Sequence, residues 1–320
     1  MALHNYFADM TFSFPRCLKL TSKKLVTPLQ PKLSIVVAFY NMRREAVRTL
    51  FSLTTAYQQH INKDDYEVIV LDSNSSEPLQ QEWVESLQSN FIYRYISTSQ
   101  PTPCKAMNTG ISIARAEHIV CMIDGARILS PGILSNMMRI NGFAPNAFIQ
   151  TISMHIGSEL QNISVTKGYN QKVEDRLIAT IDWELNGYHL FDISSLAASS
   201  KRGYLHPLSE SNCFSAPKKK LLEINGFDEN FQMPGGGLVN LDVMNRINED
   251  LSIEPYVLLG EASFHQFHGG VATNVPLDEH PSEIFREEYM TLRRKPFLPN
   301  KRQPTFYGRL NGHSMKCIIP

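Results

Sequence analysis

Polar residues stand directly after three apolar segments in the first half of the chain. Tyr40 and Asn41 follow the first segment, Asp72 ends the second, and Asp124 follows a later one. Any one of them could be a turn former and nothing more. Together they offer carboxylate, amide and phenol groups at matching strand ends. Ligands of open parallel sheets bind outside the carboxyl ends of the strands, so the set indicates a ligand site.

The segments that position these residues alternate between strand and helix patterns over residues 31–145. Leu33–Tyr40, Glu67–Leu71 and His118–Ile123 are continuous apolar runs rich in β-branched residues, typical of parallel strands covered on both faces. Between them, apolar residues recur at helical spacing. The alternation with short turns predicts an α/β fold with a mainly parallel, doubly wound sheet flanked by helices.

The composition excludes several classes of protein. The 320 residues include 31 Lys+Arg and 31 Asp+Glu, a balance that argues against a general nucleic-acid binder. No apolar run approaches the roughly 20 residues that span a bilayer, and no secretory leader pattern is present. The cysteines are odd in number and scattered, which indicates reduced thiols. We expect a cytoplasmic protein, at most peripheral to a membrane.

The second half of the chain has a less regular pattern. Glu174–Leu185 is expected to contain a helix that carries several acids and Trp183. A glycine-rich loop at Pro234–Gly237 precedes a helix that begins near Leu238. Glu261–Phe267 is extended and carries His265, with His268 following. These features predict a mixed second half added to the regular first half.

Taken in order, these segments resemble the family 2 glycosyltransferases of the GT-A fold. The similarity covers about residues 33–270 and is carried by four stretches, residues 33–53, 66–78, 104–134 and 212–231. It implies a Rossmann-type sheet and an enzyme that moves a sugar from a UDP- or GDP-linked donor to a saccharide or other hydroxyl acceptor. Polysaccharide biosynthesis would be its setting.

The resemblance assigns donor and acceptor positions. It implies that Asp72 binds the base or ribose of the nucleotide, and that Asp124 is the first aspartate of a D-x-D motif near the sugar and diphosphate. The other expected donor-binding residues are Ala38, Tyr40, Asn41, Asn108 and Gly125. Trp183 and Gly236 are expected at the acceptor, where the Trp183 indole could stack on a sugar or could instead belong to the core.

The resemblance also implies a divalent cation, Mn²⁺ or Mg²⁺, held by Asp124 with His265 and His268. Both ions favour oxygen ligands, and Mn²⁺ also accepts imidazole. The two histidines could equally make structural hydrogen bonds in a loop. The third position of the D-x-D triplet is Ala126, so one expected carboxylate is missing.

The catalytic base is expected at Asp242. The acidic pair of the family falls at Val239 and Asn240, which leaves Asp242 as the acid of residues 238–246. At a helix start, the N-terminal dipole would favour its charged, proton-accepting form. The same acid could simply stabilise the helix start. Other acids remain alternatives for the base, namely Glu174, Asp175, Asp182 and Glu184.

Three functions remain open, in order of preference. The first is a metal-assisted glycosyltransferase that acts on a glycan or a lipid- or protein-linked saccharide, inverting by default, although the histidine motif keeps a retaining course open. The second is a non-catalytic nucleotide-sugar-binding module, which the missing carboxylates would explain. The third is a nucleotidyltransferase, less favoured because no glycine- and lysine-rich triphosphate loop follows the first strand.

We expect one GT-A domain with additions at both ends. Residues 1–30 form an N-terminal extension, and residues 31–145 the nucleotide-sugar-binding half. Residues 146–285 form the acceptor-binding and catalytic half, and residues 286–320 a C-terminal tail.

Overall fold

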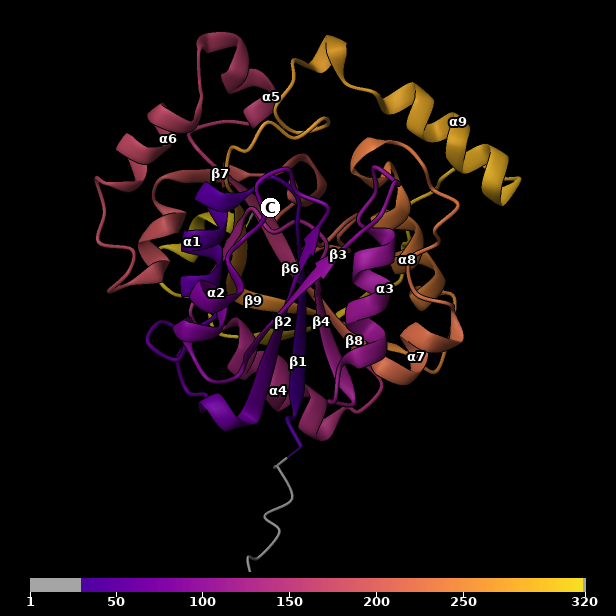
Figure 1. Ribbon diagram of the computed structural model, residues 1–320, viewed down its shortest axis with the longest axis horizontal. Helices are drawn as coiled ribbons and strands as arrows, with labels where there is room; N and C mark the ends of the chain where they lie inside the picture. Colours follow the sequence, from indigo (N-terminus) through magenta and orange to yellow (C-terminus); the bar gives the residue numbers. More distant parts are fainter. Residues whose placement is uncertain (1–29, 319–320) are drawn as a thin grey trace, which may run out of the picture.

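The computed structural model describes residues 30–318, so nearly all of the expected N-terminal extension lies outside the described residues. One twisted sheet forms the centre of the molecule, with helices packed on both faces (Figure 1). The strand order is β10-β9-β6-β8-β4-β1-β2-β3, while β5 pairs with β9 and β7 with β6. This arrangement confirms the expected α/β class.

The first half of the sheet is parallel. Its strands are β1 (Leu33–Phe39), β2 (Tyr66–Ser73), β3 (Phe91–Ile96) and β4 (His118–Met122). β1 lies between β2 and β4, and all three run in the same direction. All residues of β1, β2 and β4 are buried, as the continuous apolar runs predict for strands covered on both faces.

Alternate side chains of β1 enter two different cores, because successive side chains of a strand point to opposite faces. Leu33, Ile35, Val37 and Phe39 pack with the helices of one face, which are α1 (Arg43–Phe51), α2 (Gln81–Leu87) and α4 (Ile133–Phe143). Val36 and Ala38 pack with those of the other, α3 (Cys104–Ile113), α7 (Lys218–Glu223) and α8 (Val239–Asn248). The two layers flank the sheet in Figure 1.

The second half of the sheet is mixed, as expected. β8 (Phe214–Pro217) runs antiparallel to both β4 and β6 (Ala147–Ile156). β9 (Glu254–His265) is parallel to β6 and to β10 (Thr305–Gly308). The short strands β5 (Arg127–Leu129) and β7 (Ser194–Leu196) add antiparallel pairs to β9 and β6.

Three further helices surround the carboxyl ends of the parallel strands, namely α5 (Gln161–Ser164), α6 (Gln171–Ile178) and α9 (Ser282–Arg293) (Figure 1). The expected helix in Glu174–Leu185 ends early, at Ile178. Short 3-10 turns complete the chain at Lys63–Asp65, Val165–Lys167, Gly187–Phe191, Ala198–Ser200, Pro234–Gly236, Leu277–Glu279 and Ser314–Cys317. Within residues 30–318, no helix is both long and apolar enough to traverse a bilayer.

Candidate active site

A cavity of about 840 Å³ lies at the carboxyl ends of the parallel strands. Residues that follow β1 and β2 line one part of it, and α8 and the segment after β9 line another. The expected site residues that reach it are Ala38, Tyr40, Asn41, Asp124 and His268. The sheet therefore brings the polar ends of its strands together around one cavity, as its topology requires.

Asp124 lies in a tightly packed turn two residues after β4. Its Oδ1 accepts a hydrogen bond of 3.0 Å from the backbone N–H of Ala126. Gly125 is buried beside the Phe39 ring, and a Cβ atom there would collide with that ring. The Thr49 hydroxyl donates to the Gly125 carbonyl at 2.6 Å. Gly125 therefore fixes the turn by close packing, and it does not itself line the cavity as expected.

Two histidines of the segment Glu261–His268 lie beside the Asp124 carboxylate. The Nε2 atom of His265 is 3.2 Å from Asp124 Oδ2, and that of His268 is 3.8 Å from Oδ1. One ligand atom from each of the three residues lies within 4.8 Å of the other two. The structure thus gathers, from distant parts of the sequence, the three residues expected to hold a cation.

The hydrogen bonds of His265 determine which of its nitrogens is free. Its Nδ1 lies 2.6 Å from Gln161 Oε1, and this oxygen also accepts from Asn274 Nδ2 at 2.9 Å. Nδ1 therefore carries the proton, and Nε2 presents a lone pair to the Asp124 carboxylate without a hydrogen-bond partner. Two acceptors that face each other at 3.2 Å are well suited to hold a cation between them.

The charges at the floor of the cavity favour an ionised Asp124 and a neutral His265. Burial and then the Arg127 charge lower the pKa of His265 to about 4. Burial alone would raise the pKa of Asp124. The adjacent His268, His265 and Arg127 outweigh that effect and hold this pKa well below its usual range. A neutral imidazole and a carboxylate are the forms that bind metal ions.

Arg127 is a cavity residue that sequence reasoning missed. Arg127 of β5 lies opposite His265 of β9 in the sheet, and His265 lies opposite His155 of β6. The three side chains are therefore neighbours on adjacent strands. Arg127 is 4 % exposed, and neither its Nε nor its Nη1 has a hydrogen-bond partner. Nε lies 3.2 Å from Asp124 Oδ2. A buried guanidinium with unused donors can receive an anionic oxygen of a ligand.

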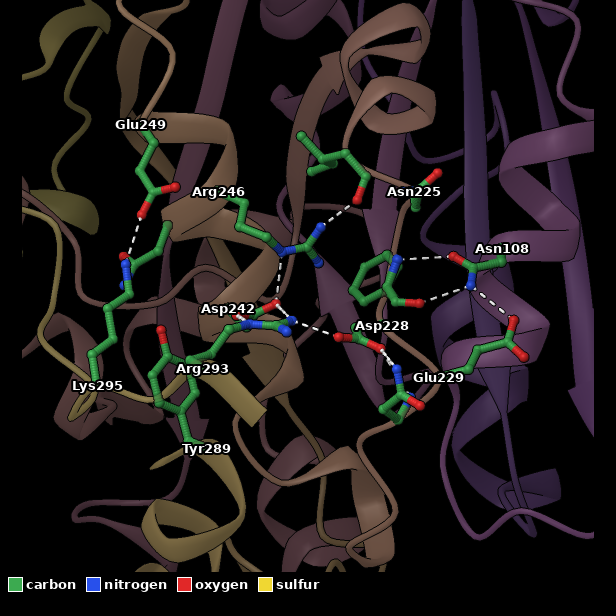
Figure 2. A pocket seen from close by; sticks show the side chains of 14 residues that line it. Asn108, Asn225, Asp228, Glu229, Asp242, Arg246, Glu249, Tyr289, Arg293 and Lys295 are labelled. Atoms are coloured by element: carbon green, nitrogen blue, oxygen red, sulfur yellow. Dashed lines mark hydrogen bonds and ion pairs between the residues drawn. The ribbon is translucent and has the colours of Figure 1, made fainter. Parts of the chain in front are cut away.

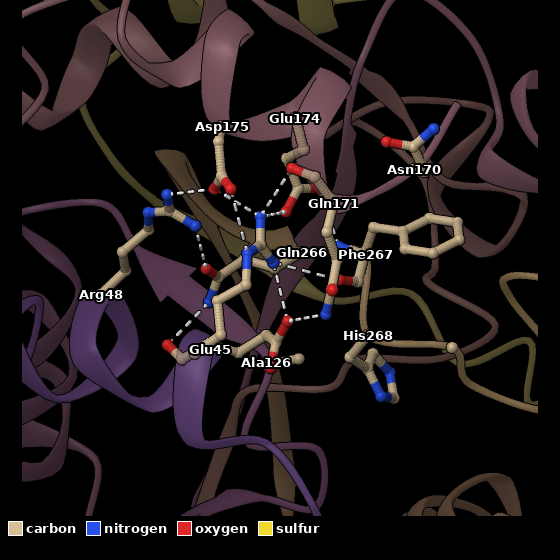
Figure 3. A network of polar contacts seen from close by, with 12 residues as sticks. Glu45, Arg48, Ala126, Asn170, Gln171, Glu174, Asp175, Gln266, Phe267 and His268 are labelled. Atoms are coloured by element: carbon tan, nitrogen blue, oxygen red, sulfur yellow. Dashed lines mark hydrogen bonds and ion pairs between the residues drawn. The ribbon is translucent and has the colours of Figure 1, made fainter. Parts of the chain in front are cut away.

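A network of charged side chains fixes the segment that carries His268 (Figure 3). Arg44 and Arg48 of α1 both bind Asp175 of α6, at 2.6 and 2.5 Å. Arg44 also binds Glu174, which accepts a hydrogen bond of 2.7 Å from the Phe267 backbone N–H. Burial raises the pKa of Glu174 to about 7. Glu174 and Asp175 thus serve this network and do not line the cavity, which removes them as alternatives for the base.

The structure does not support the expected contact of Asp72 with a nucleotide. Asp72 is buried, and its two carboxylate oxygens accept hydrogen bonds from the backbone N–H groups of Ser75 and Leu79 at 3.2 and 2.8 Å. Both oxygens therefore hold the turn after β2. The residues of that turn that line the cavity are Ser73 and Asn74.

The structure also places Asp242 away from the cavity that holds Asp124. Asp242 lines a second cavity of about 610 Å³, where Arg293 Nε binds Oδ1 at 2.6 Å and Arg246 Nε binds Oδ2 at 2.7 Å (Figure 2). Two helical positions correspond to about 200° of rotation, so Asp242 points away from the face of α8 on which Asn240 lines the first cavity. A carboxylate bound by two guanidinium groups outside that cavity is not positioned to act as its base.

Three other residues that were expected at the donor or the acceptor do not line the 840 Å³ cavity, namely Asn108, Trp183 and Gly236. Asn108 lines the second cavity, where its side chain bonds both backbone groups of Phe227. Trp183 is 4 % exposed and packs its ring against Phe51 and Tyr57, as a core residue. Gly236 is buried with φ of +89° in a turn whose glycine neighbours line the first cavity.

The remaining two acids do not line the first cavity. Asp182 contacts the Nδ1 of His189, and Glu184 is exposed. Besides Asp124, the acid that lines this cavity among the described residues is Glu210, in the loop before β8, and Asn212 of the same loop lines it as well. Nothing in the local pattern around Glu210 predicts its position, because that loop has no regular spacing.

The comparisons with known proteins agree with this fold. No protein with a curated description matches the sequence, but the model of the family "Glycosyl transferase family 2" matches residues 34–197, just over half of the chain. Among solved structures, TarS 1–349 of S. aureus matches at 13% identity with a TM-score of 0.50, over 73% of this chain and 60% of that one.

Two more solved structures match less closely in space. TarS 1–349 in complex with UDP matches at 14% identity and a TM-score of 0.48, over 73% of this chain and 57% of that one. The mannosyltransferase PcManGT of Pyrobaculum calidifontis, in complex with GDP-Man and Mn²⁺, matches at 14% identity with a TM-score of 0.48. The match covers 84% of this chain and 66% of that one. The chain thus spans less than two thirds of these proteins. By the match of its family model, the chain belongs to glycosyl transferase family 2.

Proposed function

We propose that this protein transfers a sugar from a nucleotide-sugar to a hydroxyl group of an acceptor, with the reaction in the 840 Å³ cavity. The observation that carries the proposal is the cluster of Asp124, His265 and His268 at the carboxyl edge of the sheet in a family 2 chain. Glycosyl transfer needs stabilisation of the departing diphosphate, which a cation held by this cluster would supply together with the charge of Arg127.

The donor set fits a divalent cation. His265 presents an unpaired Nε2 to Asp124, and Gln161 fixes the orientation of that imidazole. With two imidazoles and one carboxylate, the set suits Mn²⁺ better than Mg²⁺, which prefers oxygen ligands. When bound, the cation would act as a Lewis acid toward the diphosphate of the donor. Arg127 adds a fixed positive charge at the same place.

The rest of the cavity offers surfaces for both substrates. The residues after β1 and β2, which include Tyr40, Asn41 and Asn74, suit the nucleoside. Tyr40 is exposed at the rim, where its ring can stack on a base. The acceptor, a glycan or a lipid- or protein-linked saccharide, would enter between residues 197–199 and residues 271–273, which line the cavity from the second half of the chain. The reaction would be a direct displacement with inversion, in which a base takes the proton of the acceptor hydroxyl and its oxygen attacks the anomeric carbon on the face opposite the diphosphate.

The non-catalytic alternative rests on Ala126, which is fully buried where the motif would have a carboxylate, and on Asn240. A panel of UDP- and GDP-sugars, tested for thermal stabilisation with and without Mn²⁺, separates the possibilities when followed by a transfer assay. A ligand at about a hundred times its Kd adds roughly 2.7 kcal/mol, an easily measured shift. Binding with transfer supports the enzyme, binding alone supports the module, and no binding contradicts both.

A further inference from the structure

Few carboxylates reach the proposed reaction cavity. Among the described residues that line it, only Asp124 and Glu210 carry a carboxylate. Asp124 is engaged with His265, His268 and Arg127, where it would bind the cation. If the acceptor hydroxyl loses its proton to a carboxylate of this cavity, Glu210 is the remaining candidate.

The surroundings of Glu210 connect it to the position where the family resemblance places an acid. Asn240, at that position on α8, donates from Nδ2 to Glu210 Oε1 at 2.9 Å. The same amide also donates to the Ser211 carbonyl at 3.2 Å, and its own Oδ1 is buried without a partner. The helix thus supplies an amide that holds a carboxylate, and the loop before β8 supplies the carboxylate itself.

The loop around Glu210 is anchored well enough to position a catalytic group. The adjacent Ser211 is fully buried. Its hydroxyl oxygen lies 3.0 Å from the Thr151 carbonyl oxygen and 2.8 Å from that of Cys213, so the hydroxyl can donate to either carbonyl. The Ser211 hydroxyl also accepts from the Thr151 backbone N–H at 3.1 Å. Glu210 itself is partly exposed, so one end of its side chain is fixed and the carboxylate is accessible to an acceptor.

The histidines of the cavity are weaker bases for this step. His155 accepts a hydrogen bond on Nδ1 from the Gln161 backbone N–H, so its other nitrogen carries the proton in the neutral ring. His268 lies beside Asp124 in the cation cluster. His280, which packs its ring near Phe285, remains the rival to be tested.

We propose that Glu210 is the general base of the transfer, a role that rests on the proposed function. A carboxylate oxygen of Glu210 takes the proton of the acceptor hydroxyl. The hydroxyl oxygen forms a bond to the anomeric carbon, and the bond from that carbon to the phosphate oxygen breaks. Its electron pair leaves with the nucleoside diphosphate, and Glu210 then returns the proton to water.

The direct test is Glu210→Gln in the full chain. With UDP and GDP as probes in calorimetry, the Kd should stay within about twofold of the wild type, which also shows that the variant is folded. Turnover should fall by about 10²–10⁴-fold, the range for a lost general base, and the acidic limb of the pH–rate profile should disappear. The matched control is Glu184→Gln, an exposed acid outside the cavity, which should match the wild type.

A second variant moves the base back to the helix. The double variant Glu210→Gln with Asn240→Asp should turn over at least tenfold faster than Glu210→Gln alone, because the new carboxylate occupies the neighbouring position. No recovery, or full turnover in Glu210→Gln alone, would overturn the assignment, as would loss of turnover in His280→Gln without loss in Glu210→Gln. A wild-type chain that binds no nucleotide-sugar would overturn the proposed function and this inference together.

Discussion

Arg127 places a positive charge beside the Asp124 carboxylate at the floor of the cavity in which we propose that the donor diphosphate binds. Its Nε and Nη1 are buried without hydrogen-bond partners, an arrangement that a protein tolerates when a ligand completes it. The sequence places Arg127 directly after the triplet that resembles D-x-D. Ala126 takes the place of the second carboxylate in that motif. A basic residue next to such a replacement is the sequence feature that could have predicted Arg127 as a site residue.

Replacing Arg127 with glutamine should weaken nucleoside diphosphate binding by about 1.5–3 kcal/mol, or roughly 10- to 150-fold, as expected for a lost hydrogen bond to a charged group. Binding of the nucleoside without phosphates should not change. Thermal stability should fall, because the substitution also removes the buried positive charge that lies 3.2 Å from the Asp124 carboxylate. Calorimetry with UDP, GDP and the matching nucleosides measures this, and equal weakening of nucleoside and diphosphate would refute a role at the phosphates.

The candidate cation site and the expected contacts that the structure does not show indicate how much the type and position of single residues can predict. Asp124, His265 and His268 could be proposed from their positions and residue types, and the structure brings them together. Asp72 and Asp242 were also plausible from type and position, but their oxygens are bound by backbone N–H groups and by guanidinium groups. Which partner occupies a carboxylate depends on residues distant in sequence, so local pattern does not reveal it.

At the scale of elements, the Asp242 carboxylate joins α8 to α9. It contacts Arg246 on its own helix and Arg293 at the end of α9, and Arg293 also binds Asp228 at 2.8 Å. Asp242 is 1 % exposed, so loss of its charge deprives Arg246 and Arg293 of the buried carboxylate that they share. The ion pair between Asp242 and Arg293 therefore stabilises the packing of α9 on α8, and Phe285 of α9 lines the proposed reaction cavity.

Asp242→Asn should lower the free energy of unfolding by about 3 kcal/mol, because it breaks a largely buried ion pair by removing one partner. Turnover per folded molecule, measured at low temperature, should remain within about twofold of the wild type. Denaturant unfolding and initial rates are the two measurements. A stable variant with turnover reduced a hundredfold or more would restore Asp242 as the base.

A second buried acid, Glu261 of β9, connects that strand to the start of α4 and to the turn at Gly187–Phe191. It accepts hydrogen bonds from the Ser130 hydroxyl, the Gly132 backbone N–H and the Tyr188 hydroxyl. Burial raises its pKa from 4.5 to about 7, and these hydrogen bonds oppose the rise. The titratable groups that face it are the phenols of Tyr57, Tyr188 and Tyr204.

The folded protein therefore binds a proton at Glu261 that the unfolded chain releases near pH 4.5. This contribution to the free energy of unfolding is fully present below pH 4.5 and is lost as the pH rises toward 7. The total loss amounts to about 3 kcal/mol at most. Glu174, whose pKa is also raised to about 7, acts in the same direction. Denaturant unfolding between pH 5 and 8 should show a shallower fall for Glu261→Gln than for the wild type, and parallel curves would contradict the assignment.

At the scale of the whole molecule, the two halves differ in how far the sequence predicts them. Leu33–Phe39 and the strands beside it are buried on both faces, so hydrophobicity alone predicts them and the parallel sheet. In the second half, β5 has three residues and β7 has three, and both are positioned by pairing with longer strands. The loop that carries Glu210 has no period, so only the folded chain places it at the cavity.

We propose that one cavity, where the two halves of the sheet meet, performs acceptor-dependent sugar transfer through a cation held by Asp124, His265 and His268. The measurement that tests it most directly is the release of nucleoside diphosphate from a panel of UDP- and GDP-sugars, with Mn²⁺ and saccharide acceptors, by the wild type and by Asp124→Asn. We predict acceptor-dependent release that falls by orders of magnitude in EDTA and in the variant. Full release in EDTA and by Asp124→Asn would show that neither a cation nor Asp124 is needed for transfer.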